Sequence, residues 1–223
     1  MFLYKIIDFN RLFCYNGSMK LYLCKSEDFT DLYGIELLSP YRREQISRYK
    51  KIENKVRSLV GGLLLKYAFK DRANEIAVGK NGKPYLDGEH FNLSHTDGVV
   101  ALAVANSSVG VDIEKVRSVN ISVGDKMFSE SENEFLATLS KDEKNIKFFD
   151  IWVGKESVVK TIGSGINSLM KTFSLLPLSD GYYQADGKLY YLRWLAFESY
   201  RLCIASENIE PLEVVWLNKT QLI

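Results

Sequence analysis

Residues 99–114 read VVALAVANSSVGVDIE, and this stretch sets the organisation of the chain. It contains two apolar strands, 99–104 and 109–114, which are separated by the polar turn Asn106-Ser107-Ser108. The turn marks the seam between two halves. We therefore predict a domain boundary between residues 107 and 108.

The N-terminal half, 1–107, combines a long helix with short strands. Ser39-Pro40 provides a capping residue and a first-turn proline, and apolar residues then recur at helical spacing from Ile46 to Tyr67. The predicted strands of this half are 21–24, 76–78, 84–86, 91–93 and 99–104, with Asn81-Gly82 as a turn. Residues 1–18 form an apolar extension, which we expect to pack on this half rather than stay solvated.

The C-terminal half, 108–223, repeats the mixture of helix and strand. Ser129 to Glu132 reads SESE, a capping box that starts a helix through Leu139, and a second helix runs from about 145 to 162 before Gly163 ends it. The predicted strands are 109–114, 173–175, 182–185, 188–197 and 200–205, with Asp186-Gly187 as a hairpin turn. Each half is thus a mostly antiparallel sheet packed on helices, which is the α+β class.

Composition restricts the partners of this 223-residue chain. With 29 Lys and Arg against 28 Asp and Glu, the net charge of +1 gives no field that would attract nucleic acid or an anionic membrane. The apolar runs are too short to span a bilayer, and Lys5, Asp8 and Arg11 interrupt any secretory signal. Three cysteines without CxxC spacing fit a reducing cytoplasm, where we expect the protein to reside.

Common nucleotide-binding and hydrolase motifs are absent, and paired acids are the first chemical signal. Asp112 and Glu114 lie two apart in a strand and therefore project from one face. Paired carboxylate oxygens suit magnesium. Alone, however, the pair also describes an ordinary acidic strand edge.

A second signal is the turn Phe91-Asn92-Leu93-Ser94-His95-Thr96. Ser94, His95 and Thr96 offer a hydroxyl, an imidazole and backbone donors to a phosphate, although such residues also build ordinary turns. No role is assigned to His90.

A third signal is the helical segment 152–160, WVGKESVVK. Glu156 and Lys160 share a helix face, either as a routine ion pair or as a third carboxylate with a cation beside it. Lys155, and Lys83 in the rigid turn Gly82-Lys83-Pro84, add the positive charge that metal-assisted phosphoryl transfer requires.

Taken in order, five motifs resemble the 4′-phosphopantetheinyl transferases, in particular their long, monomeric, surfactin-synthetase-activating type. The motifs are GKP at 82–84, FNLSHT at 91–96, VGVDIE at 109–114, FSESE at 128–132 and WVGKESVVK at 152–160. The similarity extends from about Met19 to the C-terminus and includes Ser39-Pro40 and the helix that carries Arg57.

The resemblance implies a fold and a reaction. The fold is a pseudo-dimer of two similar α+β halves, with the active site at their interface. The reaction transfers the 4′-phosphopantetheine group of coenzyme A to a serine of an apo acyl or peptidyl carrier protein, with Mg2+, and releases adenosine 3′,5′-bisphosphate. We expect a monomer.

The resemblance also implies residue roles. Asp112, Glu114 and Glu156 would hold Mg2+, and Glu156, or a water that it orients, would accept the serine proton, with Glu132 in support. Lys155 and Lys160 would neutralise phosphate charge. The residues that would hold the phosphates of coenzyme A are Arg42, Arg57, Lys83, Pro84, Ser94 and His95.

Two positions depart from the family pattern. Gln45 stands where a second basic residue is expected, and Gly154 lies inside a helix, where a close approach of substrate would explain it. The rival hypotheses are a non-catalytic module of the same fold that binds coenzyme A or carrier protein, and a metal-dependent nuclease or phosphatase. The first should lack a metal ligand, and the second should carry a basic surface.

Overall fold

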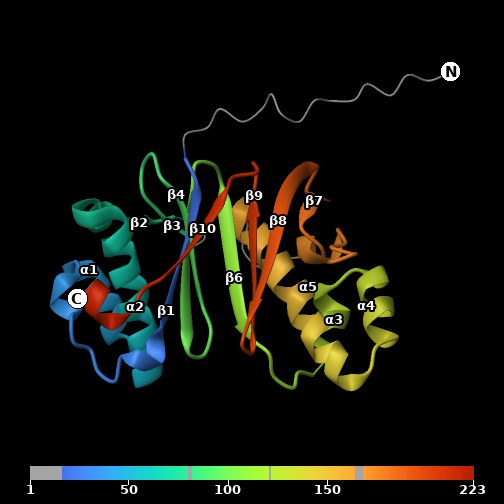
Figure 1. Cartoon of the computed structure of the whole chain (residues 1–223), viewed down its shortest axis with the longest axis horizontal. Coiled ribbons are helices and arrows are strands. Elements are labelled where there is room, and N and C mark those ends of the chain that lie inside the picture. Colours follow the sequence, from blue (N-terminus) through green and yellow to red (C-terminus); the bar gives the residue numbers. More distant parts are fainter. Residues whose placement is uncertain (1–16, 80–81, 121, 164–167) are drawn as a thin grey trace.

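The computed structural model describes residues 17–79, 82–120, 122–163 and 168–223, hereafter the described residues. Two sheets lie between two groups of helices, with α1 and α2 at one end of the molecule and α3, α4 and α5 at the other (Figure 1). The α+β class is therefore confirmed. Within the described residues, no helix is both long and apolar enough to cross a membrane.

The first sheet has the strand order β10-β1-β5-β4. β1 pairs antiparallel with β5 and parallel with β10, so that Met19 lies opposite Leu212. The strands are β1 (Met19–Lys25), β4 (His90–His95), β5 (Val99–Ala105) and β10 (Leu212–Trp216). The other elements at this end are α1 (Pro40–Ser47), α2 (Ile52–Phe69), the small ladder of β2 (Ala77–Val78) with β3 (Pro84–Tyr85), and α6 (Lys219–Leu222).

The second sheet is antiparallel throughout, with the order β6-β9-β8-β7. Its strands are β6 (Val109–Lys115), β7 (Gly181–Ala185), β8 (Lys188–Phe197) and β9 (Tyr200–Ser206). Its helices are α3 (Ser122–Met127), α4 (Glu130–Ala137) and α5 (Lys141–Ile162). α5 ends where Gly163 adopts a left-handed φ of 79°, as its sequence predicts.

The core divides into layers because successive strand residues face opposite sides. In β1, Tyr22 and Cys24 pack with the α2 side chains, whereas Leu21 and Leu23 pack against β6 and β9 of the second sheet. Both faces of β1 are therefore buried. A fully buried aliphatic side chain contributes about 1.5–3 kcal/mol, so these contacts hold the two sheets firmly together.

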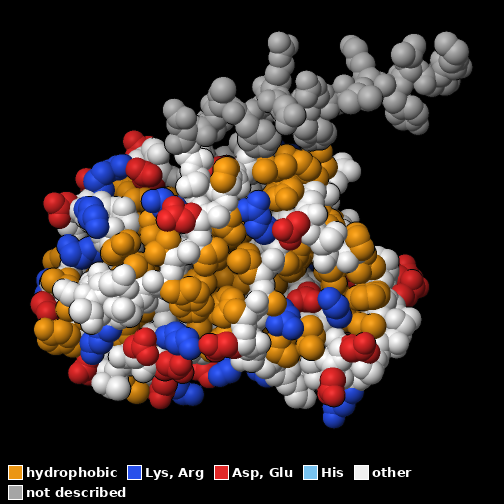
Figure 2. Space-filling view, in the orientation of Figure 1, with side chains coloured by type: hydrophobic (Ala, Val, Ile, Leu, Met, Phe, Trp, Pro, Cys, Tyr) orange, Lys and Arg blue, Asp and Glu red, His pale blue; other side chains and the backbone are white. Residues whose placement is uncertain are grey.

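β10 lies beyond the boundary that the sequence predicts between residues 107 and 108, but it contacts both sheets. It forms an edge of the first sheet, and Trp216 packs edge-to-face on Phe197 of β8 at 5.2 Å between ring centroids. Hydrophobic side chains gather in the middle of the face in Figure 2, where Figure 1 places β10, and the exposed apolar residues of this strand are Val214 and Trp216. The C-terminal residues thus complete the N-terminal sheet.

Several sequence predictions differ from the structure. The helix expected from Ser39 onward is two helices, because the chain breaks between Ser47 and Ile52. Residues 173–175 form no strand, and β10, α3 and α6 were not predicted. Residues 1–16 and Asn81, which carry the extension and part of a turn, lie outside the described residues.

Candidate active site

β6 places Asp112 and Glu114 on the face opposite the inter-sheet core. Val111 and Ile113, which alternate with them, are buried between the two sheets. On the other face, α5 crosses β6 so closely that a Cβ atom on Gly110 would collide with the backbone of Ser157 and Thr161. This close approach brings Glu156 and Lys160 of α5 over the two acids.

Lys160 is the centre of a group of direct contacts. Its Nζ donates to Asp112 Oδ1 at 2.6 Å, to Ser94 Oγ at 3.1 Å and to the Val111 carbonyl at 3.2 Å. The Ser94 hydroxyl in turn donates to Asp112 Oδ1 at 2.8 Å. Three of the predicted site residues, from β4, β6 and α5, are thus in contact.

Glu156 is buried beside this group. Burial, followed by the negative charge of Asp112, raises the pKa of Glu156 to about 7, while Lys160 acts in the opposite direction and Glu114 adds to the rise. Glu156 Oε1 and Asp112 Oδ2 are buried and have no hydrogen-bond partner among the described residues. The site therefore contains two buried carboxylate oxygens that no hydrogen-bond donor of the described residues satisfies.

Glu114 extends the site toward solvent. Its Oε2 accepts hydrogen bonds from Thr96 Oγ1 and from Arg117 Nη1, both at 3.0 Å. Arg117 also lies over the ring of Phe149, with its guanidinium carbon 5.0 Å from the centroid. A hollow lined by Arg57, His95, Thr96, Glu114, Lys115 and Arg117 opens next to these side chains.

Arg57 and His95 line this hollow as potential anion-binding groups. Arg57 contacts Asn54 at 2.6 Å and Asp97 at 3.3 Å, but its buried Nε has no partner in the described part of the chain. Burial lowers the pKa of His95, and the positive charges of Arg57 and Lys160 lower it further. Together, Arg57 and His95 would offer an entering phosphate a guanidinium and an imidazole, beside the cations Lys115 and Arg117.

Arg42 and Pro84 lie elsewhere, in a mostly apolar pocket between α1, α2 and β3. Arg42 Nη2 donates to the Ser58 carbonyl at 3.1 Å. Lys83 Nζ donates to the Lys160 carbonyl at 2.6 Å, so its ammonium sits at the C-terminal end of α5. These three residues flank the cluster without joining it.

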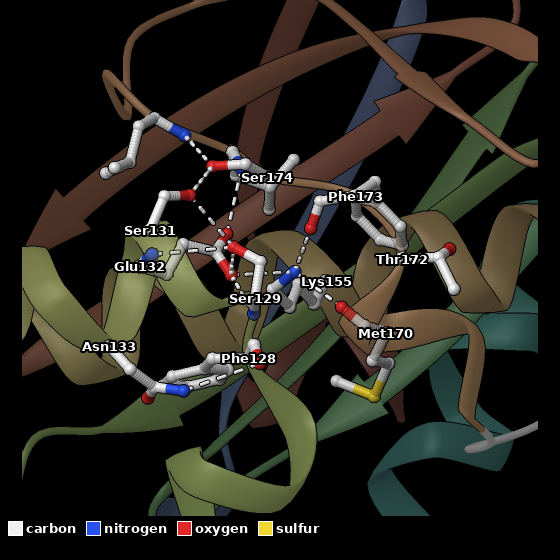
Figure 3. Close-up of polar contacts among 12 residues, drawn as sticks. Phe128, Ser129, Ser131, Glu132, Asn133, Lys155, Met170, Thr172, Phe173 and Ser174 are labelled. Carbon is white, nitrogen blue, oxygen red and sulfur yellow. Dashed lines mark hydrogen bonds and ion pairs between the residues drawn. The ribbon is translucent and has the colours of Figure 1, made fainter.

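Glu132 and Lys155 form a separate, fully buried pair, with side chains 0% exposed and 2.9 Å between Nζ and Oε2. Lys155 also donates to the carbonyls of Met170 and Phe173, each at 2.6 Å, and Glu132 accepts from Leu175 N and from the Ser129 cap (Figure 3). Burial lowers the pKa of Lys155, and Glu132 opposes this shift.

This placement corrects two expectations, the phosphate contact of Lys155 and the support of Glu132 for the proton acceptor, because the two side chains are buried against each other. Consecutive helix residues point about 100° apart, so Lys155 faces away when Glu156 faces the site. Gly154 also has a structural explanation, because a Cβ atom there would meet Leu175 and Trp194 rather than a substrate.

Asn92 and Arg117 were not predicted as site residues, and Thr96 was predicted only as a phosphate contact. The Asn92 amide oxygen accepts from Val111 N at 2.9 Å, and Thr96 contacts Glu114. The overlooked signal was the alternation of small polar residues at 92, 94 and 96 in an otherwise apolar strand. Nothing in the sequence near Arg117 distinguishes it from other exposed cations.

The donor set fits a hard divalent cation. No three His, Cys, Asp or Glu side chains within the described ranges are grouped closely enough to hold a metal ion as they stand. Asp112 and Glu156 nevertheless each have a buried carboxylate oxygen without a partner among the described residues. Burial first, and then the charges of Asp112 and Glu114, raise the pKa of Glu156. Carboxylate oxygens are the ligands that Mg2+ prefers, and a cation here would relieve the repulsion.

Comparisons with known proteins point to one family. The family model of the 4′-phosphopantetheinyl transferase superfamily matches residues 108–205. The 4′-phosphopantetheinyl transferase gsp of Aneurinibacillus migulanus is 35% identical over 143 residues, which cover 61% of this chain and 60% of that protein. The chain therefore spans less than two thirds of that relative.

Two further relatives are covered more fully. The 4′-phosphopantetheinyl transferase ffp of Bacillus subtilis is 30% identical over 70% of this chain and 73% of its own length. For Sfp of Bacillus subtilis (strain 168), the identity is 30% over 66% of this chain and 70% of that protein. A solved holo-[acyl-carrier-protein] synthase of Thermotoga maritima is similar at a TM-score of 0.31 and 16% identity, covering 44% of this chain and 61% of that one.

Proposed function

The chain belongs to the 4′-phosphopantetheinyl transferase family, and from this premise we propose that it loads apo acyl or peptidyl carrier proteins. The group transferred is the 4′-phosphopantetheine of coenzyme A, and the product released is adenosine 3′,5′-bisphosphate. The observation that carries the proposal is the pair of buried carboxylate oxygens, Asp112 Oδ2 and Glu156 Oε1, that have no hydrogen-bond partner among the described residues. The third acid, Glu114, lines the neighbouring hollow together with Arg57, Lys115 and Arg117.

The reaction is a phosphoryl transfer. The serine oxygen of the carrier attacks the phosphorus atom bonded to pantetheine, and a new P–O bond forms. The P–O bond to the adenosine-bearing phosphate breaks, and its electron pair leaves with that phosphate. The serine proton passes to Glu156, directly or through a water that Glu156 orients. In the metal-free protein, burial and then the charge of Asp112 raise the pKa of Glu156 to about 7. A bound cation would favour the ionised form, in which Glu156 can accept the proton.

Asp112, Glu114 and Glu156 would hold the Mg2+ ion. When bound, the ion neutralises the charge that develops on the pyrophosphate oxygens. Lys160 contributes a fixed positive charge beside the same oxygens, since it already pairs with Asp112. Arg57 and His95 would bind the 3′-phosphate of coenzyme A from the hollow. Ser94, Lys83, Arg42 and Pro84 would hold its other phosphates. Glu132 and Lys155 keep α5 in place.

The topology supports the proposed pseudo-dimer. When β10 and the edge strand β7 are left aside, the first strand of each sheet lies beside its last strand, and the strand before the last follows: β1-β5-β4 in the first sheet and β6-β9-β8 in the second. Each sheet also packs a long helix, α2 or α5, on its outer face. With both halves in one chain, we propose an active monomer in the cytoplasm.

Mass spectrometry tests the function. An apo carrier protein incubated with the full chain, coenzyme A and Mg2+ should gain the mass of one phosphopantetheine, and the gain should disappear when its serine is replaced by alanine. Coenzyme A binding without any mass gain, across acyl and peptidyl carriers, would instead support the non-catalytic module.

A further inference from the structure

β4 and β6 are neighbouring edge strands that belong to different sheets. Their ladder partners are β5 and β9, respectively, and no ladder joins them within the described residues. An edge strand presents alternate N–H groups outward, and such groups need partners when they are buried. Side chains of β4 and of the residue after it supply these partners.

Asn92 provides the first link. Its side chain is 5% exposed, and its amide oxygen accepts a hydrogen bond from Val111 N, the residue before Asp112, at 2.9 Å. This contact involves only the β6 backbone and touches none of the proposed site residues. It fixes β6 against β4 in one register, and a shift by one residue would turn Asp112 and Glu114 to the opposite face.

Thr96 provides the second link, one strand repeat beyond Ser94. The residue is 7% exposed, so its hydroxyl is not available to a phosphate in solution. The hydroxyl donates to Glu114 Oε2 at 3.0 Å and accepts from Lys115 N at 3.2 Å. A hydroxyl can donate once and accept at the same time, so Thr96 ties the Glu114 carboxylate to the backbone of its own strand.

We propose that Thr96 is a positioning residue that orients the Glu114 carboxylate toward the metal, with Asn92 as a second positioning residue that sets the register of β6. The inference rests on the proposed function, because Glu114 is a metal ligand only if that function holds. Partners behind metal ligands typically change metal affinity by about 10- to 100-fold when they are removed.

The test compares Thr96→Val, which keeps the shape but loses the hydroxyl, with Thr96→Ser, which keeps the hydroxyl. Mn2+ binding to the full chain, without coenzyme A or carrier, is followed by the electron paramagnetic resonance signal of free Mn2+, with Mg2+ as competitor. We expect Thr96→Val to weaken Mn2+ binding about tenfold or more and Thr96→Ser to bind nearly as tightly as wild type. Asn92→Leu should weaken binding as well.

Ser107→Ala is the matched control. Ser107 is buried in the turn before β6, and its hydroxyl donates to Glu210, a carboxylate that is not part of the site. This variant should lose thermal stability while its Mn2+ affinity stays at the wild-type value. The control therefore shows whether the loss of any buried hydroxyl lowers Mn2+ affinity, or only the loss of the Thr96 hydroxyl that contacts Glu114.

The outcomes distinguish the two proposals. If wild type loads carrier protein and binds Mn2+, but Thr96→Val binds Mn2+ equally well, the positioning role is refuted and the function stands. If Thr96→Ser is as defective as Thr96→Val, the hydroxyl is not the relevant group, and the inference is likewise overturned. If wild type binds no Mn2+, both the metal site and the inference fail.

Discussion

Two neighbouring residues of α5, Lys155 and Glu156, differ in how completely their polar atoms are satisfied. Lys155 pairs with Glu132, and its ammonium also contacts two backbone carbonyls and the ring of Phe173, all inside the protein. One residue further along the helix, Glu156 lies near Lys160 with a buried oxygen that has no partner among the described residues. Each has an oppositely charged neighbour, but the environments are not the same.

The difference separates a structural pair from a reactive one. A buried charge whose hydrogen bonds are all made holds chain segments together, and breaking it exposes an uncompensated charge. A buried carboxylate with a free oxygen and a raised pKa is costly to the fold, and such a cost is typical of groups that bind metal or exchange protons. Four experiments test this contrast, beginning with the largest expected effect.

Replacing Glu156 should damage function and spare the fold. We expect Glu156→Gln to lower the rate of carrier loading about 10²- to 10⁴-fold, because the proton acceptor is lost. Thermal unfolding of the metal-free variant should occur at or above the wild-type temperature, since repulsion with Asp112 is relieved. A variant that loads carrier at the wild-type rate would remove Glu156 from the reaction.

Replacing Lys155 should destabilise the fold and leave the rate of carrier loading nearly unchanged. Lys155→Met leaves Glu132 charged and buried without its partner, so we expect the free energy of unfolding in urea to fall by about 3–5 kcal/mol. The folded fraction should load carrier at close to the wild-type rate. If the variant is as stable as wild type but inactive, Lys155 takes part in the reaction and the structural role is wrong.

The pH dependence of the free energy of unfolding should report the raised pKa of Glu156. The pKa of Glu156 is raised from 4.5 to about 7 in the folded protein, so the folded state holds this proton more tightly than the unfolded state does. In the metal-free protein, the contribution of Glu156 to stability should fall as pH rises from about 4.5 to about 7 and level off above that, by at most about 3 kcal/mol.

Urea unfolding with EDTA across this pH range measures the change. Glu156→Gln serves as the reference and should lack the decline, because glutamine does not titrate. Parallel curves for wild type and variant would show that Glu156 ionises normally. Lys155→Met is a further control and should keep the decline.

The smallest expected effect concerns the Arg57 side chain and the binding of coenzyme A. Arg57 Nε is also buried without a partner in the described residues, beside the hollow. Calorimetry should show that coenzyme A binds about tenfold or more tightly than dephospho-coenzyme A, since a charge-assisted hydrogen bond contributes about 1.5–3 kcal/mol. Arg57→Gln should reduce this preference. Equal affinities in wild type would exclude Arg57 as a contact of the 3′-phosphate.

Local patterns in the sequence were sufficient for much of the fold. The bounds of β8 and the end of α5 at Gly163 follow from strand alternation and from a left-handed glycine. The common face of Asp112 and Glu114 follows from the two-residue period of a strand. β10 was missed because its partner, β1, lies near the opposite end of the chain, and no local pattern records such a pairing.

The placement of Lys155 was not predictable for a different reason. Residues 153–159 of α5 are buried all round, so this turn of the helix has no polar face that would show which side meets the site. The strand predicted near residues 173–175 is absent from the structure. Their backbone instead supplies the Phe173 carbonyl and Leu175 N–H to the Glu132 and Lys155 pair.

The position of β10 has a consequence for biosynthesis. A ribosome delivers β1 early, but the neighbour that covers its outer edge becomes available only after Leu212–Trp216 have been translated. Until then, the nascent first sheet has an open edge, and Leu21 and Leu23 lack the second sheet that buries them. We therefore expect the nascent N-terminal half to be a substrate for chaperones and to reach its final packing only after β10 has been made.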